Sequence, residues 1–180
     1  MLLLSEEGPD TLAEKARLFG IEHHPRFHVL LRRQVQASWP EVVGQSRQYC
    51  REHDLDVLVV DTFDKWTGLR GDDENKSGPV SEALEPLMRA AGDELAVVLI
   101  SHQRKAPGDH GEAVRGSNAL TGAVDVIVEV ERVADVPHAR VLYGTSRFVG
   151  TPEELAAGLA DLAVVPEAGG EGEQPQADAG

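Results

Sequence analysis

The chain has 180 residues, a length that fits one domain with a substantial core and leaves little room for a second. Its residues are 41% hydrophobic but only 4% aromatic, which favours layered helices and sheets over a β-sandwich or barrel. The formal net charge of −14 argues against a broad nucleic-acid-binding surface. Cys50 is the single cysteine, so an intrachain disulfide and a cysteine-rich zinc site are excluded.

The apolar run at residues 1–4 is followed at once by Ser5, Glu6 and Glu7, with no basic segment before it. This run is too short for a membrane span and lacks the pattern of a signal peptide. We therefore expect a soluble, cytoplasmic protein without membrane contacts.

Short apolar runs alternate with amphipathic stretches, a pattern typical of βα units on a largely parallel sheet. The predicted strands, in chain order, are residues 2–4, 27–31, 56–60, 95–100, 124–130 and 139–144. The predicted helices are residues 10–20, 38–53, 80–91 and 117–122, with a last small helix capped at 151–154. The first of these helices has a capping-box pattern at Asp10, and Ser38 is the expected cap of the second. The last two strands are predicted to be antiparallel neighbours, because Pro137 falls in a short connection between them.

The remaining segments are predicted to be loops or disordered. Residues 62–79 form a polar loop and residues 103–116 a mobile one. From residue 166 to 180, Gly, Glu, Gln, Pro and Ala dominate, which is typical of a disordered acidic tail. The sequence therefore predicts one folded unit over residues 1–165.

Three predicted parallel strands end in polar or acidic residues. These ends are Ser5-Glu6-Glu7, Asp61-Thr62 and Ser101-His102. In open parallel sheets, ligands bind beyond the carboxyl ends of the strands. A single acid there is more often a turn or cap residue, but three polar ends at one edge favour a magnesium–phosphate site. Such a site needs one carboxylate to orient the water shell of the metal and a second to prepare the attacking water.

Five short segments, taken in their order and spacing over residues 1–148, resemble the RecA-like ATPases of the hexameric-helicase type. This family includes the plasmid replicative helicase RepA and many related AAA-family ATPases. The segments are Leu4-Ser5-Glu6-Glu7-Gly8-Pro9, the Walker B-like Leu58-Val59-Val60-Asp61-Thr62, Asp72-Asp73-Glu74-Asn75-Lys76-Ser77-Gly78-Pro79, the sensor-like Leu99-Ile100-Ser101-His102-Gln103-Arg104-Lys105, and Arg115-Gly116-Ser117. The resemblance implies a RecA-like, doubly wound, mostly parallel α/β sheet with helices on both faces and antiparallel strands at its C-terminal end.

The resemblance also implies roles for individual residues around Mg-ATP. Glu7 corresponds to the glutamate that activates water, with Glu6 as the alternative. Asp61 would hold magnesium through water, with Thr62 beside it in the nucleotide site. His102 would sense the γ-phosphate.

In the family, ATP binds between subunits of a homo-oligomeric ring, and its hydrolysis drives movement on single-stranded DNA or remodels a partner. Lys105 and Arg115 would lie on the loop that faces the central channel, where they could meet a phosphate backbone. A solvated loop is an equally good interpretation of these two residues, given the acidic chain.

The chain departs from the family at two points. No G-x-x-x-x-G-K-[ST] phosphate-binding loop (Walker A) occurs in the 180 residues. We therefore expect a truncated ATPase core that begins just downstream of that loop and is inactive alone, with the phosphate-loop strand absent between 95–100 and 124–130. Asp125 occupies the position at which the family has its arginine finger. The alternative interpretation is a non-catalytic RecA-fold interaction module that has lost nucleotide binding.

Overall fold

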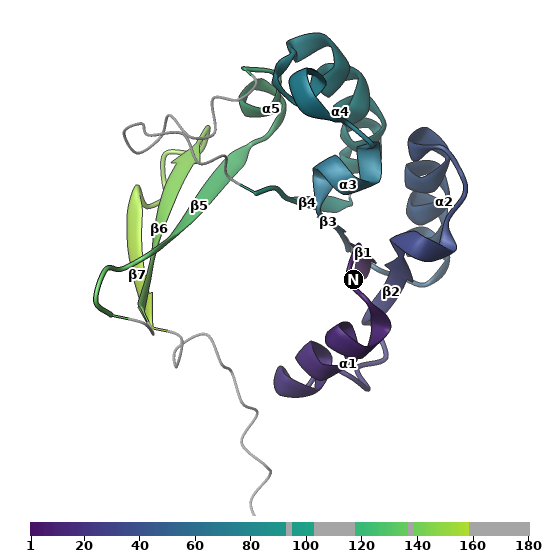
Figure 1. The fold of residues 1–180 in the computed structure, drawn as a ribbon, viewed down its shortest axis with the longest axis horizontal. Coiled ribbons are helices and arrows are strands. Elements are labelled where there is room, and N and C mark those ends of the chain that lie inside the picture. Colours follow the sequence, from purple (N-terminus) through teal and green to yellow (C-terminus); the bar gives the residue numbers. More distant parts are fainter. Residues whose placement is uncertain (93–94, 103–117, 137–138, 159–180) are drawn as a thin grey trace, which may run out of the picture.

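β-Strands and helices alternate through the computed structural model, which describes residues 1–92, 95–102, 118–136 and 139–158 (Figure 1). The strands are β1 (Leu2–Ser5), β2 (His28–Leu31), β3 (Val57–Asp61), β4 (Ala96–Ile100), β5 (Val126–Arg132), β6 (Ala139–Ser146) and β7 (Glu154–Gly158). The α-helices are α1 (Pro9–Leu18), α2 (Trp39–Glu52), α3 (Phe63–Thr67), α4 (Ser77–Ala91) and α5 (Asn118–Ala123). Two short 3-10 helices are η1 (Arg32–Gln34) and η2 (Gly71–Asn75).

The first four strands form a parallel sheet in the order β2-β1-β3-β4. Parallel strands need a crossover connection, and α1, α2 and α4 lie in the three crossovers. The central strands β1 and β3 are nearly continuous apolar runs, as expected for strands with both faces covered. The predicted α/β class and parallel sheet are therefore confirmed.

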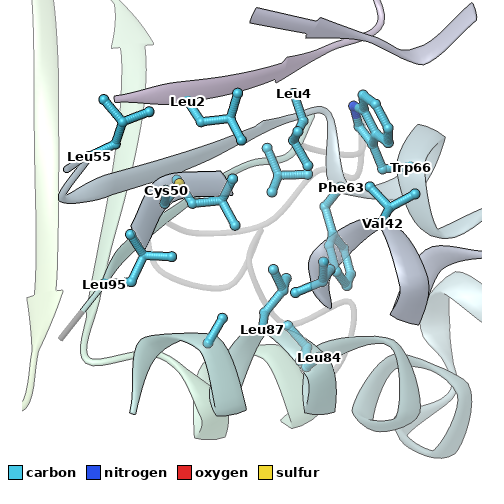
Figure 2. Packing of buried hydrophobic residues seen from close by; sticks show 14 of the residues in the cluster. Leu2, Leu4, Val42, Cys50, Leu55, Phe63, Trp66, Leu84, Leu87 and Leu95 are labelled. Carbon is cyan, nitrogen blue, oxygen red and sulfur yellow. The ribbon is translucent and has the colours of Figure 1, made fainter. Parts of the chain in front are cut away.

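One face of the parallel sheet carries the hydrophobic core. Leu4 is completely buried there, in a cluster with residues of the helices α2 and α4 (Figure 2). Leu58 belongs to the same cluster and is also completely buried. Leu84 and Leu87 of α4 pack against the same cluster, because helical positions three residues apart lie on one face. Helix α1 lies on the other side of the sheet (Figure 1). Helices thus lie on both sides, but the large core is on one.

The helix starts show one confirmed and one wrong prediction. Ser38 is the N-cap of α2, and its backbone N–H and hydroxyl both donate to Glu41 Oε2, at 2.8 and 2.6 Å. The capping box predicted at Asp10 is wrong: α1 begins at Pro9, after Gly8, without a side-chain cap. Proline starts the helix because its fixed φ suits the first turn and its missing N–H is not needed there.

Two further predictions about secondary structure are wrong. Residues 62–79 are not one polar loop, since they contain α3, η2 and the first turn of α4. Helix α3 forms because Phe63 and Trp66 turn one apolar face into the core, and it ends at Gly68 with φ of 75°. The small helix predicted after a cap at 151–154 is also wrong, because Glu154–Gly158 forms β7, which pairs with the long strand β6.

The C-terminal strands form a second sheet, ordered β5-β6-β7, and the predicted antiparallel pairing of β5 with β6 is confirmed. Within the described residues this sheet shares no strand pairing with the parallel sheet (Figure 1). In the part of the chain that the structure describes, β4 therefore pairs only with β3, and β5 pairs only with β6. The predicted tail at residues 166–180 lies outside the described residues.

We call β4 and β5 the open strands, because each has one edge that no described strand pairs with and one exposed apolar face. On β4, the side chains of Val98 and Ile100 are 46% and 40% exposed. On β5, those of Val126, Val128 and Val130 are 43%, 54% and 58% exposed. Contiguous apolar surface and a bare strand edge both favour association with another polypeptide segment.

Polar substitution on the open strands should cost little folding stability. We expect Val98→Thr and Val128→Thr to change the free energy of unfolding by no more than about 0.5 kcal/mol, because both side chains are already half in water. The same change at the buried Val60 should cost about 1–3 kcal/mol, since its hydroxyl would lack a partner. Urea unfolding followed by circular dichroism measures all three.

Light scattering should show slower aggregation for the two open-strand variants than for the parent chain. Equal losses of stability at Val98, Val128 and Val60 would mean that the open faces are covered in solution.

Candidate active site

The register of the parallel sheet brings the predicted polar strand ends together. Ser5 of β1 lies beside Asp61 of β3, and Asp61 lies beside Ile100 of β4. The residues that follow these three, Glu6, Thr62 and Ser101-His102, therefore leave the sheet at the same edge. The backbone N–H of Glu6 extends this row by donating to the Asp61 carbonyl at 2.9 Å.

The two adjacent glutamates meet different partners. Glu6 Oε1 accepts a hydrogen bond from Thr62 Oγ1 at 3.3 Å, and Thr62 is almost completely buried. Glu7 forms an ion pair with Lys15 of α1. Its backbone N–H donates to the hydroxyl of the buried Ser5 at 3.2 Å, which fixes the turn after β1. The structure thus separates Glu6, held by Thr62, from Glu7, which faces a charge.

Asp61 is the electrostatic centre of this edge. Burial raises the pKa of its carboxyl group, and the negative charge of Glu7 raises it further. The positive charges of Lys15 and His102 act in the opposite direction. Glu7, Lys15 and His102 therefore all lie within electrostatic reach of Asp61. The Asp61 carbonyl also accepts a hydrogen bond from the indole N–H of Trp66 at 3.3 Å.

This arrangement fits a magnesium ion that is held through water. Among the described residues, no three His, Cys, Asp or Glu side chains converge as a metal site. Protein magnesium sites commonly use one or two carboxylates, and water and phosphate oxygens complete the octahedron. Asp61 supplies one such carboxylate. A cation bound near Asp61 would reduce the electrostatic repulsion between Asp61 and Glu7, and it could at the same time bind a phosphate.

Some candidate residues are not described or have other partners. Lys105 and Arg115 lie outside the described residues. His102 is exposed at the end of β4. Asp125, at the position expected for an arginine finger, lies 3.5 Å from Arg147 in an ion pair. The sequence reasoning missed Lys15, because no motif marks it; its place one turn before the end of α1 is the only available signal.

Comparison with protein-family models and with curated protein sequences finds no match to this chain. Within the described ranges, no helix is long and apolar enough to span a bilayer. The grouping of Glu7, Asp61 and His102 is therefore judged on geometry and charge alone.

Asp61→Asn should stabilise the fold at neutral pH. The raised pKa of Asp61 means that the folded chain holds its proton to a higher pH than the unfolded chain. Stability therefore falls as the pH rises from the ordinary aspartate pKa through the raised value, and the loss persists at pH 7. We expect the variant to have a higher melting temperature at pH 7 and an unchanged one near pH 3.

Thermal unfolding followed by circular dichroism at the two pH values measures this difference. The matched control is Asp72→Asn, which removes an exposed carboxylate of η2 and should not change the pH dependence. A lower melting temperature for Asp61→Asn at pH 7 would show that ionised Asp61 is net stabilising.

Proposed function

We propose that this chain forms the acidic half of a magnesium–ATP hydrolysis site in a RecA-like ATPase, of the kind found in RepA- or DnaB-type helicases and DNA-remodelling ATPases. The observation that carries the proposal is the placement of Asp61 and Glu7 at one sheet edge, where the charge of Glu7 and that of His102 both act on Asp61. Two carboxylates beside a cationic group, beyond the ends of parallel strands, suit phosphate chemistry.

In this proposal each side chain has a separate task. Glu7 orients the attacking water and takes its proton, and Lys15 holds the Glu7 carboxylate in place. Asp61 binds the water shell of the metal, while Thr62 keeps Glu6 away from the reacting centre through its hydroxyl. His102 contacts the terminal phosphate from the end of β4. Bound Mg-ATP supplies the phosphoanhydride bond and the charge neutralisation that its cleavage requires.

The proposal requires a phosphate-binding loop, and the 180 residues contain no G-x-x-x-x-G-K-[ST] segment. Backbone N–H groups and the lysine of such a loop provide most of the recognition of a triphosphate. The unpaired edge of β4 is the suitable docking place for the strand that leads into the loop. That edge ends at Ile100, directly beside Asp61, so a loop following a parallel strand there would reach the acidic edge.

The wider assembly is also part of the proposal. A ring of identical subunits would place the nucleotide between neighbours, and single-stranded DNA would be the polymer on which it acts. Lys105 and Arg115 would contact that DNA. The acidic net charge of −14 confines any such contact to a small surface.

A second candidate function is a non-catalytic interaction module. The observation that favours it is the apolar surface of the open strands, because the exposed valines of β5 are suited to binding another polypeptide. Nucleotide binding separates the two candidates. An ATPase half-site gains ATP affinity when a phosphate loop is supplied, whereas an interaction module does not.

We expect the chain alone to bind Mg-ATP with a dissociation constant above the low-micromolar range, or not at all. Isothermal titration calorimetry measures this constant. Fusing a β-strand and a G-x-x-x-x-G-K-[ST] loop before residue 1 should create measurable binding and slow the amide exchange of β4 and β5 together. The control is the same fusion with the loop lysine changed to alanine, which should retain the protection but lose the nucleotide. Low-micromolar affinity of the unfused chain would contradict the proposed dependence on the loop.

Glu7→Gln, introduced into the loop-supplied protein, should reduce ATP turnover by ~100-fold or more while leaving nucleotide binding nearly unchanged, because it removes a base and not a ligand. Glu6→Gln is the matched control, because this neighbouring glutamate is held by Thr62 and should retain most of the activity. Phosphate release and nucleotide titration measure the two effects. If Glu6→Gln abolishes turnover and Glu7→Gln does not, the base is Glu6.

A further inference from the structure

The antiparallel sheet contains a cavity that is separate from the acidic edge of the parallel sheet. It has a volume of about 480 Å³ and lies between β5, β6 and the segment that leads into β7. This size falls in the range of small-molecule binding sites. The walls are held by backbone contacts: the N–H of Gly144 donates to the Glu153 carbonyl at 2.9 Å. Gly144 is required there, because a Cβ at this position would collide with the Pro152 carbonyl oxygen.

A buried carboxylate lines this cavity. Glu129 of β5 is only 7% exposed, and its Oε1 atom has no hydrogen-bond partner among the described residues. Its strand neighbours Val128 and Val130 are both more than half exposed, so the burial is specific to the face that Glu129 shares with the cavity. A carboxylate oxygen that is shielded from water without a hydrogen-bond partner is costly. A ligand that donates hydrogen bonds to Glu129 would remove this cost.

The other groups of the cavity indicate a positively charged ligand. Glu153 adds a second acidic residue to the lining, and none of the described lining residues is a Lys or Arg. Tyr143 lies directly opposite Glu129 in the β5–β6 pair. Burial, followed by the charges of Glu154 and Glu131, raises the pKa of Tyr143, so its hydroxyl stays protonated. The region around the cavity therefore has a negative potential.

The shape of the lining favours an organic cation over a metal ion. Tyr143 and Phe148 both line the cavity, and aromatic faces attract guanidinium and ammonium groups. Among the described residues, no cluster of three His, Cys, Asp or Glu side chains is available for a metal. A guanidinium group presents a planar array of N–H donors, which matches a carboxylate beside hydroxyl and carbonyl acceptors.

We propose that this cavity binds a guanidinium group, with Glu129 as its carboxylate partner and Tyr143 and Phe148 as its aromatic walls. The group belongs either to a free small molecule or to an arginine side chain of a peptide, and both present the same chemistry to the cavity. The site does not depend on nucleotide binding, because it lies on a different sheet from Asp61.

The test is a titration of the 180-residue chain, followed by amide chemical shifts, with two probes. Arginine amide represents the free molecule, and the peptide Gly-Arg-Gly represents the side chain. Saturable shifts centred on Glu129 and Tyr143 are expected with at least one of them, and tighter binding of one probe identifies the source. Citrulline amide, the neutral isostere, should bind at least ten times more weakly.

Glu129→Gln should weaken binding of the better probe at least tenfold. The control Glu131→Gln removes the same charge from the same face of β5, outside the lining, and should change the affinity less than threefold. Phe148→Leu provides a second test at an exposed position where folding is not at risk, and it should weaken binding several-fold. Equal affinities for arginine amide and citrulline amide, or equal effects of the two glutamine variants, would overturn the proposal.

Discussion

The pairing of β1 with β3 is the constraint on which the core and the candidate active site both depend. In this register Leu4 lies beside Val60, and Ser5 lies beside Asp61. The first pair belongs to the core and the second begins the acidic edge, so a single alignment positions both. A shift by one residue would turn every apolar side chain of a strand to the other face and would also separate Glu6 from the Asp61 carbonyl. The site geometry is therefore maintained by the burial of leucines and valines.

The two faces of the parallel sheet are covered unevenly, which leaves apolar side chains exposed to water on one of them. Sheets of this type normally have both faces and all central edges covered. Here α2 and α4 cover one face, whereas Val98 and Ile100 of β4 remain in contact with water on the other. Helix α5 precedes the second sheet and packs beside α4, and the described strands of the two sheets do not pair with each other. The described residues thus form one large core and leave a second apolar surface exposed on β4.

Sequence patterns predicted the parts of the fold that depend on local rules. The apolar runs identified all four parallel strands, and Ser38, as the expected cap, identified the start of α2. The polar residues after β1, β3 and β4 were correctly expected to lie at one edge, since parallel strands end together.

The remaining features depend on contacts between distant residues, which periodicity does not reveal. Helix α3 is held by the burial of Phe63 and Trp66, and β7 by its pairing with β6. Lys15 reaches Glu7 only because α1 folds back beside the strand end. In the sequence, Glu129 has the pattern of an ordinary polar residue in an alternating strand. It is buried because residues of β6 and of the segment before β7 surround it.

The hydrogen bond from Trp66 to the Asp61 carbonyl gives the acidic edge an internal optical probe. Trp66 is buried, and the guanidinium carbon of Arg32 lies 5.6 Å from the centre of its ring. Its indole environment therefore contains both the backbone of the central aspartate and a fixed positive charge, and both influence the wavelength of emission. The chain has one other tryptophan, Trp39, whose indole N–H donates to the Ala83 carbonyl at 2.8 Å in a different part of the core. Replacing Trp39 by phenylalanine leaves Trp66 as the single tryptophan, and its emission, excited selectively over the tyrosines, reports on the surroundings of Asp61 without any added label.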